Sequence, residues 1–260
     1  MTHRVEIDDA VLTKRYASWS RDEPGREWAA LNLLSHHAPG LAPIPLDRSR
    51  LDGTSSGPCR PWVSMTVLPG RPLNGSLTPA QLDALADAVT TLWSIDPHNL
   101  PPIDTPALVE RTRTALASLR TGAGVIADAA TAAVVWLEGF TGFDVRDPVV
   151  AHGDPNLANY LWDGNRIRIV DFEDAGRGDR TLELVNLVEH LSGRATDWSS
   201  VVRRFDVDPD RFRAARCLWA AFWLTLIGPG GPSADRNPPG TAEAQAWRVL
   251  ELIRPGAGAP

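Results

Sequence analysis

The sequence predicts an α+β protein with a small β-rich N-terminal lobe and a larger, mainly helical C-terminal lobe. Three observations support this prediction. Short runs that suit strands, separated by turn residues, occupy much of residues 1–68. From residue 78 onwards, apolar residues recur mainly at helical spacing. Residues 149–175 interrupt the helices with two short strands whose ends carry polar side chains. We therefore expect two lobes, 1–68 and 69–260.

Composition limits the classes of partner. The 260-residue chain has a net charge of −6 at pH 7, which argues against nucleic acid or an anionic membrane as a partner. Cys59 and Cys217 are far apart and do not suggest a disulfide framework. The N-terminus does not read as a signal peptide, and the longest apolar run, 217–227, is too short to cross a bilayer. We expect a cytoplasmic protein with no nucleic-acid or membrane partner, and the sequence leaves its oligomeric state open.

The first elements are two strands and a helix. Residues 4–7 and 10–16 read as strands around an Asp8-Asp9 turn. The spacing predicts a helix over 24–36, with Asp22 as its cap and a proline in its first turn.

Lys14, in the second of these strands, is the single lysine among 26 lysine and arginine residues. In a chain so rich in arginine, a position that keeps lysine is a candidate for a compact ammonium group that a planar guanidinium cannot replace. The alternative is a chance lysine on the surface.

The remaining elements follow from periodicity and from breaker residues. Residues 38–61 read as loops around one short strand, and 62–65 as a buried strand. We expect 176–180 to be a loop and 228–240 to be a loop of low order. The expected helices are 78–95, 106–120, 125–138, 182–191, one beginning at Ser199, 209–227 and 242–253.

The most informative stretch is 149–175. It contains His152-Gly153-Asp154, and four residues separate Asp154 from Asn159. Residues 160–162 and 167–170 then read as a tight hairpin around a turn that contains glycine, and the second strand leads to Asp171. This hairpin brings two carboxylates and one amide to the same end.

These residue types suit phosphoryl transfer to a hydroxyl group. Such a reaction needs a carboxylate that accepts or orients the hydroxyl proton, and Mg²⁺ to neutralise the phosphate charge. Asp154 suits the first role. Asn159 and Asp171 suit the second, because Mg²⁺ prefers oxygen ligands from one or two protein groups. The alternative interpretation is a surface hairpin with ordinary solvated side chains.

The pattern H-G-D-x4-N, followed by a hairpin and D-F-E, resembles the aminoglycoside phosphotransferase and choline kinase-like family. That family has the protein-kinase fold, in which the corresponding motifs are H-R-D-x4-N and D-F-G. The resemblance implies a protein-kinase-like fold, Mg²⁺ as cofactor and ATP or GTP as phosphate donor. It also implies that Lys14, paired with Glu27 of the first helix, holds the nucleotide phosphates.

The resemblance places the adenine site in the segment between the lobes. There the carbonyl of Thr66 and the N–H of Leu68 would meet the adenine edge, with Met65 lining the back of the pocket. The family has a strand and a phosphate-covering loop before its lysine strand, but only thirteen residues precede Lys14 and none is glycine. Either the chain starts late, or the phosphates are covered differently.

For the acceptor, we expect an aminoglycoside-like or other small hydroxyl compound, and hence a role in antibiotic resistance. Glu173, Asp174 and Asp179 are the candidates for binding a cationic acceptor. We expect His152 to fix the catalytic loop, which is the segment around Asp154, and we expect His190 to be structural or on the surface. Two alternatives remain open: a kinase for choline, homoserine, a sugar or another antibiotic, and a nucleotide-binding pseudokinase without turnover.

Overall fold

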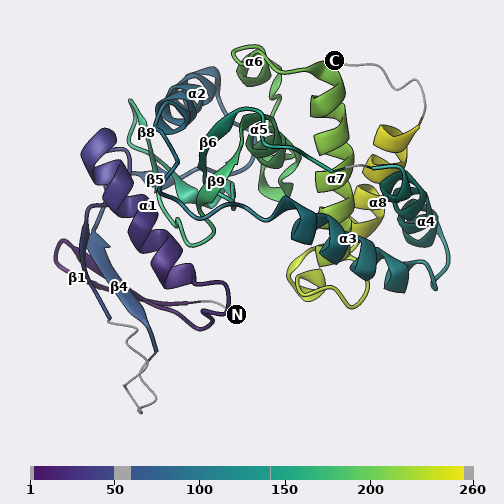
Figure 1. Ribbon diagram of the computed structural model, residues 1–260, viewed down its shortest axis with the longest axis horizontal. Coiled ribbons are helices and arrows are strands. Elements are labelled where there is room, and N and C mark those ends of the chain that lie inside the picture. Colours follow the sequence, from purple (N-terminus) through teal and green to yellow (C-terminus); the bar gives the residue numbers. More distant parts are fainter. Residues whose placement is uncertain (1–2, 50–59, 141, 255–260) are drawn as a thin grey trace.

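The computed structural model describes residues 3–49, 60–140 and 142–254. Figure 1 shows a small sheet with helix α1 at one end of the molecule and a group of long helices at the other, with short strands between them. The α+β class predicted from the sequence is confirmed. Cys59 lies outside the described residues. Cys217 is buried and forms no disulfide with a described residue.

The N-terminal sheet has four antiparallel strands in the order β1-β2-β4-β3. Helix α1 packs beside β3 and β4 and buries Ala30, Leu31 and Leu34. Asp9 makes the turn between the first two strands with φ 51°, a conformation that Asp tolerates better than most residues. The elements are β1 (Arg4–Asp8), β2 (Val11–Arg15), α1 (Glu23–His37), β3 (Pro45–Arg48) and β4 (Trp62–Thr66).

The prediction that Asp22 caps α1 with its side chain is wrong. Asp22 does precede the helix, but it has φ 58° and its carboxylate makes no capping hydrogen bond. In this left-handed conformation the carboxylate lies against Gly25 in the first turn but accepts no N–H there, as the side chain of an extended N-cap residue would. Instead, the carboxylate of Glu23 accepts the backbone N–H of Arg21 at 2.9 Å.

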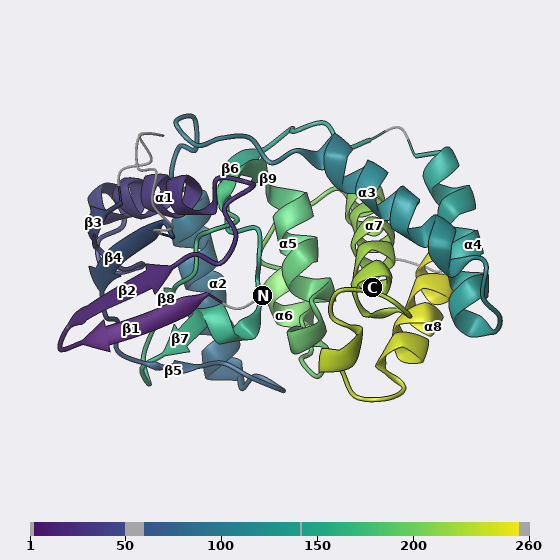
Figure 2. The ribbon, with the colours of Figure 1, turned by 90° about the horizontal axis from the view of Figure 1, so that it is seen from below.

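The helical part begins with three helices, of which the first two carry recognisable N-terminal signals. A capping box joins Thr78 and Gln81 at the start of the first, and Asp104 caps the second. In Figures 1 and 2 the last two of these helices lie beside the two C-terminal long helices, far from the N-terminal sheet. The three helices are α2 (Pro79–Trp93), α3 (Thr105–Leu119) and α4 (Val125–Glu138).

Four helices follow the hairpin region. Asp179 and Asp208 cap two of them that pack against each other, α5 and α7. Within the described part of the chain, no helix is both long and apolar enough to pass through a membrane. The bounds are α5 (Arg180–Glu189), α6 (Ser199–Val202), α7 (Pro209–Ile227) and α8 (Thr241–Ile253).

Two small antiparallel sheets lie between the ends of the molecule. Strand β6 (Pro148–Ala151) pairs with β9 (Gly176–Asp179), and β7 pairs with both β5 and β8. The expectation of a loop at 176–180 is therefore wrong. This Gly-rich segment has no strand periodicity, but Gly178 packs so closely on Ala151 that a Cβ would approach to 2.7 Å. The β5-β7-β8 sheet comprises β5 (Arg71–Pro72), β7 (Tyr160–Trp162) and β8 (Ile167–Ile169).

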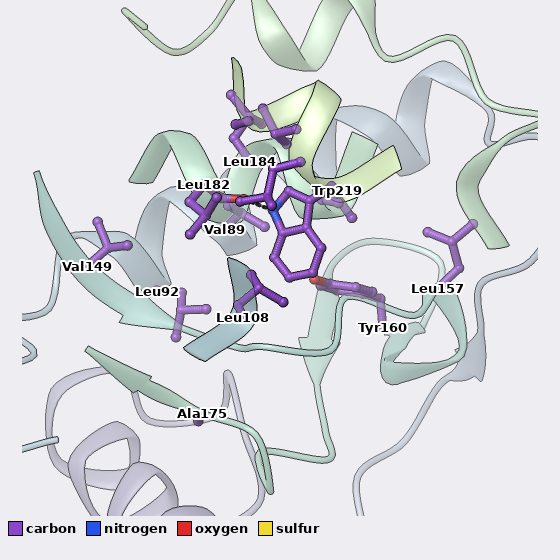
Figure 3. Close-up of a cluster of buried hydrophobic side chains, with 14 of the residues drawn as sticks. Val89, Leu92, Leu108, Val149, Leu157, Tyr160, Ala175, Leu182, Leu184 and Trp219 are labelled. Carbon is purple, nitrogen blue, oxygen red and sulfur yellow. Dashed lines mark hydrogen bonds between the residues drawn. The ribbon is translucent and has the colours of Figure 1, made fainter. Parts of the chain in front are cut away.

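A buried core supports these small sheets (Figure 3). The indole of Trp219 on α7 donates to the carbonyl of Leu182 at 2.9 Å, which ties α7 to α5. Tyr160 and Leu157, from the region after Asp154, are buried in the same core. Burial of such a side chain is worth roughly 1.5–3 kcal/mol. This packing therefore anchors the segment that carries the polar motifs to the core.

Candidate active site

The loop after β6 is held by buried backbone contacts. The Glu183 carboxylate on α5 accepts the N–H of His152 at 3.0 Å and that of Gly153 at 3.3 Å. His152 is 2% exposed, and its Nε2 lies 2.8 Å from the carbonyl of Val170. Gly153 has φ 84°, and a Cβ there would overlap the Asp174 carbonyl. The expectation that His152 fixes the loop agrees with these contacts, while Glu183 is a loop anchor that sequence reasoning missed.

Asp154 is placed by contacts to both of its carboxylate oxygens. Asn159 donates from Nδ2 to the Asp154 carbonyl at 3.0 Å and lies 3.5 Å from Oδ2. The Nε2 atom of His190 lies 3.5 Å from Oδ1. Burial acts to raise the pKa of Asp154, but hydrogen bonding to His190 and Asn159, with the charges nearby, outweighs it and lowers the pKa. The carboxylate is therefore ionised at neutral pH.

His190 is a second residue of the site that sequence reasoning missed. The N–H of Ser192 donates to Nδ1 of His190 at 3.1 Å. Neutral imidazole carries its proton on the other nitrogen in that case, so this hydrogen-bond network assigns the proton to Nε2, which faces Asp154. No spacing rule links position 190 to position 154. Only the packing of the C-terminal end of α5 brings them together.

Lys14 lies at the centre of three carboxylates. Its Nζ is 3.0 Å from Glu27 and 2.5 Å from Glu173, and it also contacts Asp171. Burial acts to lower the pKa of Lys14, but the three negative charges outweigh it and raise the pKa. Tyr16 donates its hydroxyl proton to Glu27. The structure thus brings the predicted Lys14, Glu27 and Asp171 together.

Asp171 enters this cluster in an unusual backbone conformation. Its φ is 70°, and the N–H of the next residue, Phe172, donates to Glu27 at 3.2 Å. A non-glycine residue in the left-handed region costs of order 1 kcal/mol or more and persists only where the surroundings fix it. The helix carboxylate of Glu27 therefore fixes both the lysine and the segment that follows Asp171.

The three residues expected to bind a cationic acceptor occupy different places. Glu173 lies with Lys14 and with Nε2 of His3, at 2.7 Å, so it belongs to the lysine cluster. Asp174 lines a cavity beside Asp154 but pairs with Arg21 at 2.6 Å.

Asp179 has a structural position, so its expected role in acceptor binding does not fit. Its carboxylate is 3% exposed, caps α5 by accepting the N–H of Thr181 at 3.0 Å, and pairs with Arg211 at 2.9 Å. It also accepts the N–H of Arg146 at 3.0 Å. These contacts leave no side for a ligand.

The segment 65–69 leads from β4 into the helical part. Met65 is 4% exposed, in keeping with a residue at the back of a pocket. The N–H of Thr66 donates to the carbonyl of Ile44 at 3.0 Å. Leu68 is half-buried, and its N–H makes no hydrogen bond to the described residues. The Pro69 carbonyl accepts a bond from Arg168 at 3.3 Å, which joins this segment to the hairpin.

The side chains around the hairpin suit Mg²⁺. The Nδ2 of Asn159 is used toward Asp154, which leaves its Oδ1 free to act as a ligand. Carboxylate oxygens of Glu27, Asp171 and Glu173 lie within 4.8 Å of one another. An all-oxygen set of this kind is what a hard divalent cation prefers. The residues predicted for Mg²⁺, Asn159 and Asp171, therefore have the right donor atoms, and Glu173 adds one.

A cavity of about 930 Å³ opens beside Asp154. Its walls come from the start of α1, the start of α3, the catalytic loop, the C-terminal half of α7 and residues 233–237. A second cavity of similar volume lies away from this site, between α5, α7 and α8. Among the described residues, the cavity beside Asp154 is the one that reaches the predicted catalytic carboxylate.

A strand lysine paired with a helix glutamate, and a hairpin that presents Asp154, Asn159 and Asp171, define a protein-kinase-like fold with the site of a phosphotransferase. The chain belongs to the phosphotransferase enzyme family known as APH, whose family pattern matches residues 2–219. The resemblance inferred from the sequence motifs is therefore confirmed. No curated protein sequence matches this chain.

Solved structures share this fold at low identity. A choline/ethanolamine kinase family protein from Mesorhizobium loti is 17% identical with a TM-score of 0.65, over 97% of this chain and 84% of that one. The complex of APH(2")-IIia with GDP and kanamycin gives 16% identity and a TM-score of 0.68, over 96% and 89%. Spectinomycin phosphotransferase with ADP and spectinomycin gives 12% and 0.59, over 98% and 87%. The predicted protein-kinase-like architecture is confirmed.

Proposed function

We propose that this protein is a small-molecule kinase that transfers the γ-phosphate of ATP or GTP to a hydroxyl group of an acceptor. The observation that carries the proposal is the hairpin, which joins the two halves of the site. Asn159 bonds Asp154 through its side chain, while its backbone carbonyl accepts the N–H of Val170, next to Asp171. One short segment thus sets the catalytic carboxylate relative to the lysine cluster.

In this proposal each residue has one role. Asp154 orients the acceptor hydroxyl and takes up its proton as the new oxygen–phosphorus bond forms. Its lowered pKa makes it a weak base, which suits a transition state in which the attacking hydroxyl is still largely protonated. Lys14, braced by Glu27, binds the nucleotide phosphates, and the segment Met65–Leu68 meets the adenine. We assign nucleotide binding to residues 1–68 and the remaining functions to 69–260.

Asn159 and Asp171, with Glu173, would hold Mg²⁺. When bound, this ion would neutralise phosphate charge. The three carboxylates around Lys14 leave that cluster negative, which favours a cation there before the phosphates enter.

Nucleotide binding is the first test. The melting temperature of the full chain should rise with ATP or GTP in the presence of Mg²⁺, and more than without it. The donor is the nucleotide that gives the larger rise. Asp154→Ala should keep this rise, since Asp154 lies outside the lysine cluster, whereas Lys14→Met should reduce it. If neither nucleotide changes the melting temperature of the wild-type protein at millimolar concentration, the proposed function is wrong.

A second candidate function is a nucleotide-binding protein without turnover. The turn that leads into the lysine strand is Asp9-Ala10 and has no glycine that would let its backbone approach a phosphate closely, which favours this candidate. A measurement of ADP or GDP release distinguishes the kinase from the binding protein without turnover. Release that depends on Asp154 supports the kinase, while a nucleotide-dependent rise in melting temperature without any release supports the binding protein.

A further inference from the structure

The cavity beside Asp154 has a charge pattern that restricts the acceptor. We propose that the acceptor carries an anionic group, such as a carboxylate, next to an apolar body, and that it is not a polycation. This inference depends on the proposed function, since it assumes that the cavity receives the hydroxyl compound.

The carboxylates of the cavity are already engaged. Asp104 caps α3 by accepting the N–H of Ala107 at 2.9 Å. Asp174 pairs with Arg21, and Glu183 is buried under the catalytic loop, where it accepts backbone N–H groups. Asp154 is reserved for the reacting hydroxyl in our proposal. Apart from Asp104, which is exposed and keeps its charge, the cavity therefore has no carboxylate left to pair with the ammonium groups of a polycation.

Three arginines of the cavity have no such partner. Arg26, Arg111 and Arg236 line it, and none forms an ion pair with a residue in the described ranges. Arg26 is held by carbonyl groups, those of Arg21 at 3.0 Å and Ala175 at 3.1 Å. Arg236 bonds the carbonyl of Pro232 at 3.2 Å. These contacts position the guanidinium groups without neutralising them, and guanidinium groups match carboxylate and phosphate oxygens in shape and charge.

Another part of the cavity lining is apolar and aromatic. Trp219, Phe222 and Trp223 of α7 line the cavity, with ring centroids 5.3 Å and 5.4 Å apart in consecutive pairs and edge-on geometry. This wall suits an aromatic or aliphatic ring, because such rings gain from burial and from edge contacts. The indole N–H of Trp223 is buried and has no acceptor among the described residues. An oxygen of the acceptor would satisfy it.

The arginines and the aromatic residues of the cavity can contact the same ligand. An apolar body against α7 would place an anionic group toward Arg111 and Arg236, near the start of α3 and residues 233–237. An acceptor with several ammonium groups would meet Arg111 and Arg236 there and Arg26 elsewhere in the cavity, none of them in an ion pair with a described residue, and like charges at close range are unfavourable. The expectation of a cationic, aminoglycoside-like acceptor therefore does not fit this cavity.

Three acceptors of equal size test the charge. We would use 3-phenyllactate, its amide and 1-amino-3-phenylpropan-2-ol, in which the same hydroxyl and benzyl group stand beside a negative, neutral or positive group. Their dissociation constants are measured calorimetrically with the full chain. We expect the carboxylate to bind about tenfold more tightly than the amide, and the amine to bind most weakly. Equal affinities, a preference for the amine, or no binding of the carboxylate at millimolar concentration would overturn the inference.

Arginine variants then test whether the preference for the carboxylate arises in the cavity. Arg111→Gln and Arg236→Gln should each weaken binding of the carboxylate about tenfold and leave the amide unchanged. Arg120→Gln, at the C-cap of the helix that carries Arg111 and outside the cavity, is the matched control and should change neither. If Arg111→Gln and Arg236→Gln behave like Arg120→Gln, the inference is wrong.

The nucleotide-binding experiment distinguishes a failure of this inference from a failure of the proposed function. The melting-temperature rise with ATP or GTP and Mg²⁺ does not depend on the acceptor. If that rise is present and the carboxylate shows no preference, only the acceptor class fails. If the rise is absent, the proposed function fails.

Discussion

The Nζ atom of Lys14 lies 3.0 Å from Oε2 of Glu27, and both side chains are almost completely buried. Lys14 comes from β2 and Glu27 from α1, so this ion pair joins the N-terminal sheet to its helix. A buried charge of either sign would be costly alone, and loss of one partner from such a pair typically costs about 3–5 kcal/mol. The pair therefore contributes to the stability of the N-terminal part as well as to the proposed phosphate site.

Lys14→Arg should weaken nucleotide use although it keeps the positive charge. The lysine is 6% exposed among three carboxylates and Tyr16, so a planar guanidinium does not fit the same position. We expect the KM for the nucleotide to rise about tenfold or more. Arg15→Lys, one residue further along the strand and half-buried, is the control. An unchanged KM and kcat for Lys14→Arg would mean that this lysine does not contact phosphate.

Asp154→Ala should lower kcat by about 10²–10⁴-fold, the usual contribution of a positioned acid–base group. The protein should still fold, because the Asp154 side chain is 39% exposed and supports no helix. Steady-state release of ADP or GDP measures the effect, with melting temperature as the test of folding. Turnover near the wild-type value would remove Asp154 from the reaction.

Two variants of Glu183 test whether its role depends on its charge or on the hydrogen bonds that it accepts. Burial raises the pKa of its carboxyl group, and the backbone N–H groups of Gly153 and His152 counteract this only in part. Glu183→Gln keeps an oxygen that can accept these bonds, so we expect kcat within about threefold of the wild type. Glu183→Ala leaves both N–H groups without their acceptor and should lower kcat about tenfold or more, because Asp154 loses its position. Equal activity of the two variants would contradict this role.

The pH profile of kcat should reflect the lowered pKa of Asp154. The ionised form is the active one, so activity is lost as the pH falls through this pKa. Since an ordinary aspartate has a pKa of about 3.9, Asp154 should give no acid limb above that value. His190→Phe removes one hydrogen bond to the carboxylate and leaves burial to act, so the acid limb should move to higher pH. An unshifted limb in this variant would show that His190 does not act on Asp154.

Asp179→Ala should destabilise the fold without changing acceptor binding. It removes the cap of α5 and the partner of Arg211, and a lost cap typically costs about 1 kcal/mol. Because Arg211 and backbone N–H groups also lose their acceptor, we expect a total loss of about 2–4 kcal/mol in chemical denaturation. Asp96→Ala, at a carboxylate 76% exposed, is the control and should have little effect. Unchanged stability of Asp179→Ala would contradict the structural role.

Local sequence patterns predicted much of the fold. The long helices have strong apolar periodicity and clear capping residues such as Thr78 and Asp104, so their limits are encoded within a few residues. The hairpin between Asn159 and Asp171 was also predictable, because a short turn fixes its register. Strand β9 was not. Its Gly-Arg-Gly-Asp sequence has no strand pattern of its own and pairs only because β6 lies beside it.

The sequence by itself determined the segment that carries Asp154, Asn159 and Asp171 and the family to which the chain belongs, because these residues are related by short spacings along one hairpin. The tertiary structure alone decided which charged side chains form ion pairs and which do not. It pairs Asp174 with Arg21, buries Asp179 and leaves Arg111 without an ion pair among the described residues. Such pairings join residues far apart in the chain, and the free energy of each depends on distance and burial, which only the folded arrangement of the helices sets.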